Sequence, residues 1–186
     1  MSDPGSLAAE VAELLRSRIV DVPDFPSPGI VFKDISPLLG DHRAFAAAVD
    51  AMTDAHRGHR VDRVLGVEAR GFILAGPVAY RLAAGFVAVR KPGKLPSATH
   101  ETSYDLEYGQ NVLQVHLDAV APGDRVLIVD DVLATGGTAA ATARLVAASG
   151  AELVGFALLL ELAFLAGRDV LAKARPGVPV TSLLTV

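Results

Sequence analysis

Apolar positions along the chain predict alternating strands and helices. Segments with many apolar residues predict strands at residues 61–67, 86–89, 126–129, 153–160 and 178–184, and the β-branched run at 126–129 has the pattern of a strand buried on both faces. Helices are predicted before and between them, at residues 7–19, 41–58, 72–84 and 138–148. Strands that alternate with helices at this spacing predict an α/β fold, with a mostly parallel, twisted sheet and helices on both of its faces.

Three segments depart from this alternation. Residues 22–29 are rich in proline, so they are predicted to form an extended surface loop. Residues 90–104 carry lysines, prolines and glycine without any period, which predicts a long, polar loop of the kind that binding sites use. Residues 106–108 and 111–117 predict a hairpin that turns at Gly109.

Composition narrows the class of protein. A length of 186 residues fits one domain, and 51% hydrophobic with 20% charged residues excludes a disordered chain. The net charge of −4 argues against a nucleic-acid or membrane-surface binder. The absence of cysteine excludes disulfides and thiolate chemistry. No secretory signal and no apolar run of about 20 residues is found, so we expect a cytoplasmic protein without a membrane partner.

The strand at residues 126–129 leads into a candidate binding site. Two carboxylates, Asp130 and Asp131, follow the strand, and the small residues 134–138 open the next helix. Backbone N–H groups at a helix start bind anions, and glycine lets them approach closely. Carboxylates only accept hydrogen bonds, so they suit sugar hydroxyls or a hydrated cation. The ligand expected from this pattern is a ribose phosphate.

A second strand end adds cations. Glu68 to Gly71 lies between a predicted strand and a predicted helix, and Arg70 offers a forked cation suited to phosphate oxygens. Lys91 and Lys94 lie on the loop after the next strand. Three cations apart from the phosphate loop fit a sugar that carries a diphosphate at one end and a monophosphate at the other.

The run from Val126 to Thr138 closely resembles the phosphoribosyl-pyrophosphate signature of the type I phosphoribosyltransferase family. Four further segments resemble the adenine-using members of this family: residues 25–35, 68–72, 90–96 and 104–109. The likeness extends from about Val20 to Leu160. The resemblance implies a single phosphoribosyltransferase domain over residues 1–186, of which about 1–35 form a base-binding hood. It implies purine salvage, in which adenine and phosphoribosyl pyrophosphate give AMP and pyrophosphate. It also implies Mg²⁺ carried by the substrate rather than by protein side chains, and a homodimer.

The resemblance further assigns roles to individual residues. Phe32 would stack on the purine, and backbone groups of Val31 and Lys33 would read its edge. A backbone carbonyl selects the 6-amino group of adenine, whereas a lysine side chain would select a 6-oxo group. Glu107 would be the catalytic proton-transfer group, and Tyr108 beside it would bind substrate.

The remaining roles concern phosphoribosyl pyrophosphate. Arg70, Lys91 and Lys94 would bind its pyrophosphate, and Asp130 and Asp131 its ribose. The 5′-phosphate would bind the loop of Ala134, Thr135, Gly136, Gly137 and Thr138. The resemblance also implies a cis peptide between Glu68 and Ala69.

Other functions are weighed by their motifs. A phosphate-loop NTPase lacks support because no G-x-x-x-x-G-K-[ST] motif occurs, and a dinucleotide enzyme because no G-x-G-x-x-G motif occurs. Two alternatives stay open. One is a non-catalytic ligand sensor with the same fold, and the other is a transferase for a 6-oxopurine.

Overall fold

The structure is a computed structural model that describes residues 4–105 and 110–186. The chain forms two compact units, Met1–Ala51 and Met52–Val186. The helix α3 (His42–Asp54) begins in the first unit and ends in the second.

The first unit consists of a helix, a short hairpin and two further helical segments. Its elements are α1 (Pro4–Arg16), β1 (Val20–Pro23), β2 (Val31–Asp34), α2 (Ser36–Gly40) and the first part of α3. The strands β1 and β2 are antiparallel, with Val22 opposite Phe32. The proline-rich connection between them is closed by the N–H of Gly29, which donates to Asp24 Oδ1 at 2.8 Å. The start of α3 is capped by Asp41, whose Oδ1 accepts from two backbone N–H groups.

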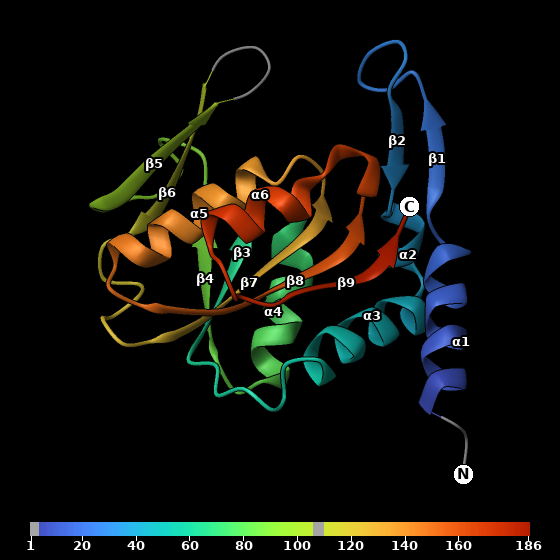
Figure 1. Ribbon diagram of the computed structural model, residues 1–186, viewed down its shortest axis with the longest axis horizontal. Helices are drawn as coiled ribbons and strands as arrows, with labels where there is room; N and C mark the ends of the chain where they lie inside the picture. Colours follow the sequence, from blue (N-terminus) through green and yellow to red (C-terminus); the bar gives the residue numbers. More distant parts are fainter. Residues whose placement is uncertain (1–3, 106–109) are drawn as a thin grey trace. The chain divides into compact units, whose positions relative to one another are not determined.

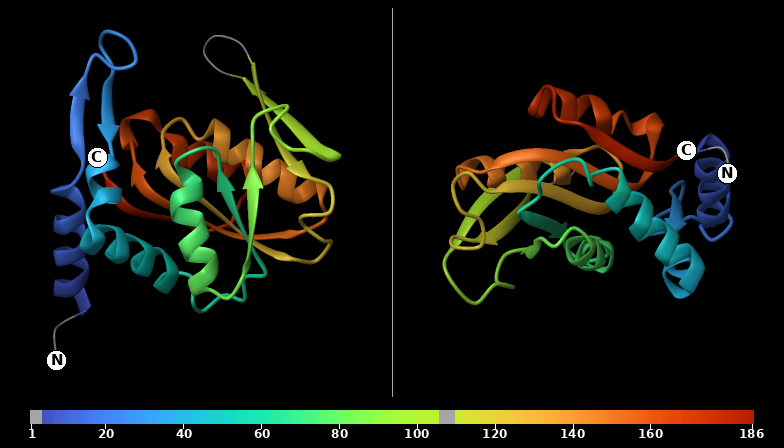
Figure 2. Two further views of the ribbon diagram at one scale, coloured as in Figure 1. Left: turned by 180° about the vertical axis from the view of Figure 1, so that it is seen from behind. Right: turned by 90° about the horizontal axis from the view of Figure 1, so that it is seen from below.

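The second unit is built on a five-stranded parallel sheet. Its strands are β3 (Arg63–Val67), β4 (Gly85–Val89), β7 (Arg125–Leu133), β8 (Glu152–Glu161) and β9 (Val180–Thr185), in the order β4-β3-β7-β8-β9. The helix α4 (Gly71–Arg81) covers one face, while α5 (Gly137–Ala148) and α6 (Gly167–Ala174) cover the other (Figures 1 and 2). A short 3-10 helix, Ala163–Leu165, precedes α6. The predicted α/β fold is therefore confirmed.

The core lies where β7 and β8 run through the middle of this sheet. Residues 126–129 are fully buried, as a strand covered on both faces requires. Four alanines of the helix α5 are buried: Ala139, Ala140, Ala141 and Ala143. Such small side chains let the helix and the loop before it lie close to the end of β7.

The prediction of a loop over residues 90–104 is partly wrong. Residues 99–105 form the strand β5 (Thr99–Asp105), which pairs antiparallel with β6 (Gln110–His116) in a separate two-stranded sheet. Most residues of β5 are polar, so no alternation of apolar positions marks it. It is stabilised instead by pairing with β6 and by packing on α5. The strand expected at residues 106–108 lies outside the described residues.

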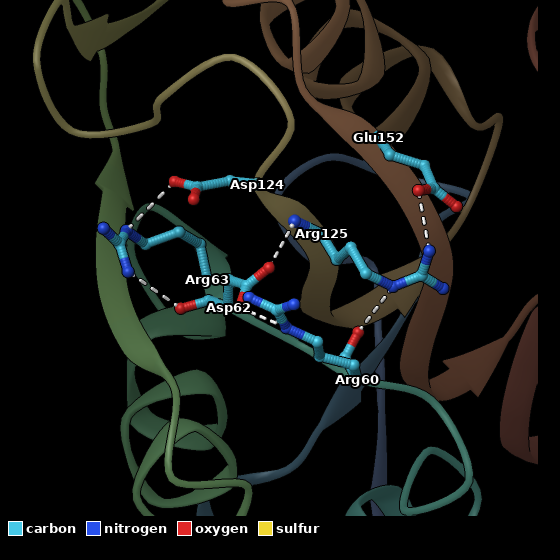
Figure 3. Close-up of polar contacts among 6 residues, drawn as sticks. All are labelled: Arg60, Asp62, Arg63, Asp124, Arg125 and Glu152. Atoms are coloured by element: carbon cyan, nitrogen blue, oxygen red, sulfur yellow. Dashed lines mark hydrogen bonds and ion pairs between the residues drawn. The ribbon is translucent and has the colours of Figure 1, made fainter.

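A charged network joins the amino ends of β3, β7 and β8 (Figure 3). The Asp62 carboxylate accepts hydrogen bonds from the backbone N–H of Arg125 and from Arg60 Nε, both at 3.0 Å. The Arg125 guanidinium donates to the Arg60 carbonyl at 2.9 Å and to Glu152 Oε2 at 2.7 Å. Arg63 Nε lies 3.5 Å from Asp124 Oδ2. These contacts fix the register of the sheet at the edge opposite the carboxyl ends of the strands.

Within residues 4–105 and 110–186, no helix has both the length and the apolar character needed to cross a bilayer. The cytoplasmic location expected from the sequence stays a prediction.

Candidate active site

The loop between β7 and α5 forms a pocket at the carboxyl end of the sheet. Asp130 and residues 132–139 line this pocket, so the structure brings together all five predicted loop residues and one of the two acids. Gly136 has a φ of 82°, a conformation that side chains strongly disfavour. The helix α5 starts at Gly137, so the first N–H groups of α5 have no partner within the helix. These groups and the helix dipole make the pocket suited to an anion.

Gly167 supports this loop from behind. A Cβ on Gly167 would lie 2.2 Å from the Ala134 carbonyl oxygen, and a Cβ on Gly136 would lie 2.6 Å from the Gly167 carbonyl oxygen. The two backbones therefore touch at positions where only glycine fits. Sequence reasoning missed Gly167, because nothing local to it reveals a contact with a loop some thirty residues earlier.

An ion pair holds the residue after Gly167 in place. The Arg168 guanidinium binds the buried Glu161 carboxylate, with Nε 2.9 Å from Oε1, and Nη1 donates to the Val180 carbonyl at 2.8 Å. The hydrogen bonds from Arg168 first, and then the one from Ser182, lower the pKa of Glu161 despite its burial. Glu161 ends β8, so the sheet itself anchors the segment that supports the loop at residues 134–138.

The two acids predicted to bind ribose differ in their surroundings. Asp131 is 7% exposed, and its Oδ2 lies 2.6 Å from Arg70 Nε as an ion pair. Asp130 Oδ1 accepts from the Asp131 N–H at 2.9 Å. The same oxygen lies 2.7 Å from the position that a Cβ on Gly71 would occupy. Burial, and then the neighbouring Asp131 charge, raise the pKa of Asp130 well above its ordinary value. The structure thus brings Arg70, predicted to bind the diphosphate, into direct contact with Asp131, predicted to bind the ribose.

Glu68 and Arg90 join two segments predicted to bind the diphosphate. The Glu68 carboxylate accepts from Arg90 Nε and Nη2, both at 3.2 Å, and from the Lys91 backbone N–H at 3.0 Å. These hydrogen bonds lower the pKa of Glu68, and those from the Arg90 side chain contribute most. Arg90 Nη1 also donates to the Lys94 carbonyl at 3.0 Å. The backbone of the Lys91–Lys94 loop is therefore fixed beside the turn that carries Arg70, while both lysine side chains are exposed.

Glu68 and Arg90 were not predicted as site residues, although the sequence carries a signal for them. The strands β3 and β4 are parallel neighbours, with Val67 opposite Val89. Opposite charges that follow two paired strands emerge at the same edge of the sheet. The peptide bond between Glu68 and Ala69 is cis, as the resemblance implied.

The predicted base-binding residues lie on β2 in the first unit. The Phe32 ring is half-buried and meets Phe25 edge to face, with ring centroids 5.1 Å apart. Lys33 Nζ lies 2.7 Å from both carboxylate oxygens of Asp21 on β1, so its side chain already has an anionic partner. Val31 is 51% exposed.

Two predicted site residues, Glu107 and Tyr108, lie outside the described residues. Among the residues that are described, no group of three or more histidine or carboxylate side chains is arranged as a metal site.

Comparisons with known proteins place the chain in a family. Residues 38–173 match the family described as phosphoribosyl transferase domain. The adenine phosphoribosyltransferase of Anaeromyxobacter dehalogenans is 57% identical over 173 residues, which covers 93% of this chain and 98% of that protein. The crystal structure of adenine phosphoribosyltransferase from Rhodothermus marinus has 50% sequence identity and a TM-score of 0.90, and covers 96% of this chain and 99% of its own.

A third comparison includes bound ligands. The adenine phosphoribosyltransferase of Saccharomyces cerevisiae, in complex with an imino-altritol bisphosphate and adenine, has 37% identity and a TM-score of 0.87. It covers 95% of this chain and 99% of its own. With this identity over nearly the whole length, the chain belongs to the phosphoribosyl transferase family and, within it, to the adenine phosphoribosyltransferases.

Proposed function

We propose that this protein transfers the 5-phosphoribosyl group from phosphoribosyl pyrophosphate to adenine, giving AMP and pyrophosphate in purine salvage. The observation that best supports the proposal concerns the carboxyl end of β7. An anion-binding helix start and the acidic pair Asp130–Asp131 lie together there, in a chain 57% identical to an adenine phosphoribosyltransferase. A monophosphate and a sugar diol are the groups that this pair of features suits.

Each part of the substrate is matched to residues of the second unit. The 5′-phosphate takes the N–H groups of the loop at residues 134–138, and the ribose hydroxyls donate to Asp130 and Asp131. The pyrophosphate takes Arg70, Lys91 and Lys94. The ion pair between Arg70 and Asp131 supports this assignment, because it brings a cation to the edge of the ribose subsite.

Charge accounts for the rate acceleration expected of this site. Breaking the bond between ribose and pyrophosphate leaves positive charge on the sugar and negative charge on the leaving group. The cations Arg70, Lys91 and Lys94 stabilise the leaving group, and the carboxylates of Asp130 and Asp131 favour the cationic sugar. Preorganisation by Glu68 and Arg90 holds the lysine loop in place before the reaction begins.

Mg²⁺ enters this proposal as part of the substrate. The acceptor-only oxygens of Asp130 and Asp131 fit a hydrated cation carried on substrate oxygens. The ion supplies further neutralisation of the pyrophosphate.

The base is read by β2. Phe32 stacks on adenine, and the backbone of Val31 and Lys33 pairs with its edge. The contact of Lys33 Nζ with Asp21 supports adenine over a 6-oxopurine, since the side chain that would donate to a 6-oxo group is already engaged.

Glu107 transfers the proton in this proposal, and Tyr108 binds substrate beside it. Replacement of Glu107 by Gln removes the charge and keeps the size of the side chain. We expect turnover to fall by about 10²- to 10⁴-fold, with a smaller change in the KM for adenine. Unchanged turnover in a single-turnover assay would remove Glu107 from the mechanism.

A product assay tests the function as a whole. The purified protein is mixed with Mg²⁺ and phosphoribosyl pyrophosphate, and with adenine, hypoxanthine, guanine or xanthine in separate reactions. AMP formed from adenine alone supports the proposal, whereas a nucleotide formed from a 6-oxopurine would indicate the second enzyme class. A protein that binds phosphoribosyl pyrophosphate but forms no nucleotide would be a ligand sensor. The proposal includes a homodimer, which sedimentation of the purified protein tests.

A further inference from the structure

Tyr104 connects the β5–β6 hairpin to the phosphate loop. Its ring packs on the backbone of Gly137, where a Cβ would lie 3.2 Å from Tyr104 Cδ2. Its hydroxyl lies 3.1 Å from Thr138 Oγ1. Thr138 lines the phosphate pocket, so a side chain from the hairpin touches a group that the pocket presents to its ligand.

Asn111 favours one direction for this hydrogen bond. Asn111 lies opposite Tyr104 in the register of the hairpin, and its Nδ2 donates to the Tyr104 hydroxyl oxygen at 3.3 Å. With its oxygen occupied by that donor, the phenol can best use its one proton toward Thr138 Oγ1. The Thr138 hydroxyl then accepts from Tyr104, and its own proton is left to point into the pocket.

The hairpin is held on α5 by contacts that do not involve Tyr104. Arg144, two turns along α5, donates from Nε to Thr102 Oγ1 at 3.2 Å and from Nη2 to the Ser103 carbonyl at 2.9 Å. Removal of the Tyr104 hydroxyl therefore leaves the hairpin attached to the helix. The ring contact with Gly137 also survives if the ring is kept.

We propose that Tyr104 is a positioning residue for the 5′-phosphate, and that its hydroxyl orients the Thr138 hydroxyl so that Thr138 donates to a phosphate oxygen. The inference rests on the proposed function, in which this loop binds the 5′-phosphate of phosphoribosyl pyrophosphate. A free threonine hydroxyl can turn either its proton or its lone pairs toward the pocket. A phosphate oxygen forms a hydrogen bond only when the threonine proton points toward it. Fixing the Thr138 hydroxyl in that orientation therefore favours phosphate binding.

Tyr104→Phe tests this role, because it removes the hydroxyl and keeps the ring. Titration calorimetry with ribose 5-phosphate should give about three- to ten-fold weaker binding, the size of one hydrogen bond. The KM for phosphoribosyl pyrophosphate should rise to a similar extent, while kcat and the KM for adenine stay unchanged. Tyr80→Phe is the matched control, since Tyr80 is 85% exposed on α4 and should bind ribose 5-phosphate as the unchanged protein does.

A double-mutant cycle with Thr138→Val separates this role from a general effect on the loop. If Tyr104 acts through the Thr138 hydroxyl, Tyr104→Phe should weaken ribose 5-phosphate binding no further once that hydroxyl is absent. Additive losses would overturn the inference. So would a Tyr104→Phe variant that binds ribose 5-phosphate as tightly as the unchanged protein.

Asn111→Leu provides a second variant for the same relay. It leaves the Tyr104 hydroxyl in place but removes the donor that directs it, so it should weaken binding by less than Tyr104→Phe does. If thermal unfolding shows that the Tyr104→Phe variant is not folded, the Asn111→Leu variant decides instead, and unchanged ribose 5-phosphate binding in it overturns the inference. Failure of the proposed function looks different, because the unchanged protein would then form no AMP and bind no ribose 5-phosphate.

Discussion

At the scale of the residue, two glycines set the shape of the loop at residues 134–138, which is proposed to bind phosphate. Gly136 adopts a left-handed conformation, and Gly167 allows one backbone to lie against another. Gly136 belongs to a motif that can be recognised from the sequence. Gly167 belongs to none, and its role depends on a contact that only the folded chain creates.

Gly167→Ala should weaken binding of ribose 5-phosphate by at least about tenfold. The added methyl would lie 2.2 Å from the Ala134 carbonyl oxygen, so the loop or α6 has to move. Overpacking of this kind also costs about 1–3 kcal/mol of stability. Calorimetry and thermal unfolding measure the two effects.

Gly76→Ala is the matched control for that substitution. Gly76 lies within α4, and nothing lies within 4 Å of a Cβ added there. The change should leave ligand binding unaltered and raise stability by up to about 1 kcal/mol, because alanine favours helix over glycine. Equal binding in Gly167→Ala and Gly76→Ala would show that the backbone contact at Gly167 does not shape the site.

His56 shows a different effect of a single residue. It is 1% exposed, its ring packs on Gly155, and neither ring nitrogen has a hydrogen-bond partner within the described residues. Burial, and then the nearby His59, lower the pKa of His56. The folded protein therefore keeps His56 neutral at a pH where the unfolded chain binds a proton.

The free energy of unfolding should accordingly fall as the pH drops below about 6.5, the ordinary pKa of histidine. The unfolded state then binds more protons than the folded state, so acid favours unfolding. His56→Leu should flatten this dependence between about pH 6.5 and 5, as measured by urea unfolding. His42→Gln, at an exposed position, should retain the slope of the unchanged protein. The same slope in His56→Leu would assign the effect to other groups.

At the scale of the element, the sheet has a structural edge and a functional edge. The amino ends of β3, β7 and β8 are joined by the network around Asp62 and Arg125. The carboxyl ends of the same strands carry Glu68, Asp130 and Glu161. Substitutions at the two edges should therefore affect different properties.

Asp62→Ala should lower Tm without changing the KM for either substrate. The carboxylate accepts from the Arg125 N–H and from Arg60 Nε, and the first of these bonds contributes most to lowering the pKa of Asp62. Its loss leaves the Arg125 N–H without its partner. Glu152→Ala removes only a more exposed carboxylate and should alter Tm little. A raised KM in Asp62→Ala with Tm unchanged would contradict the division between the two edges.

Elements with a strong apolar pattern could be predicted from the sequence, and those held by polar contacts could not. The five strands of the main sheet and the helices α4 and α5 follow from their composition and spacing. The strand β5 does not, because Thr99 to Asp105 gains its order from β6 and from the Arg144 contacts. The helix α6 was not predicted either, since its eight residues bury only Gly167 and Leu171.

The candidate site divides in the same way. Residues that belong to contiguous motifs, such as Asp130, Asp131 and the loop after them, could be predicted from the sequence. The residues that position them could not, because Gly167, Arg90 and Tyr104 act through partners far away in the chain. A motif records which groups face a ligand, whereas the supporting contacts arise only when distant segments pack together.

At the scale of the whole molecule, the proposed determinants are divided between the two units. The residues for the phosphorylated sugar lie in Met52–Val186, and those for the base lie in Met1–Ala51. In the proposed function the choice of base depends on β2, where Lys33 is paired with Asp21.

The ion pair between Arg70 and Asp131 makes the two ends of the sugar site thermodynamically linked. Without ligand, Arg70 and Asp131 bind each other. This ion pair has to be broken before Arg70 binds the diphosphate or Asp131 binds the sugar. A diphosphate that attracts Arg70 frees the Asp131 carboxylate for the sugar, and reciprocity requires that the sugar favour the diphosphate equally. Pyrophosphate and ribose 5-phosphate, added as separate molecules, should therefore each lower the Kd of the other in calorimetric titrations. Kd values that do not depend on the other ligand would mean that breaking the ion pair costs no free energy. Kd values that fall when the other ligand is present would mean that the free energy of breaking the pair is spent once, so a substrate carrying both groups binds more tightly than the separate affinities suggest.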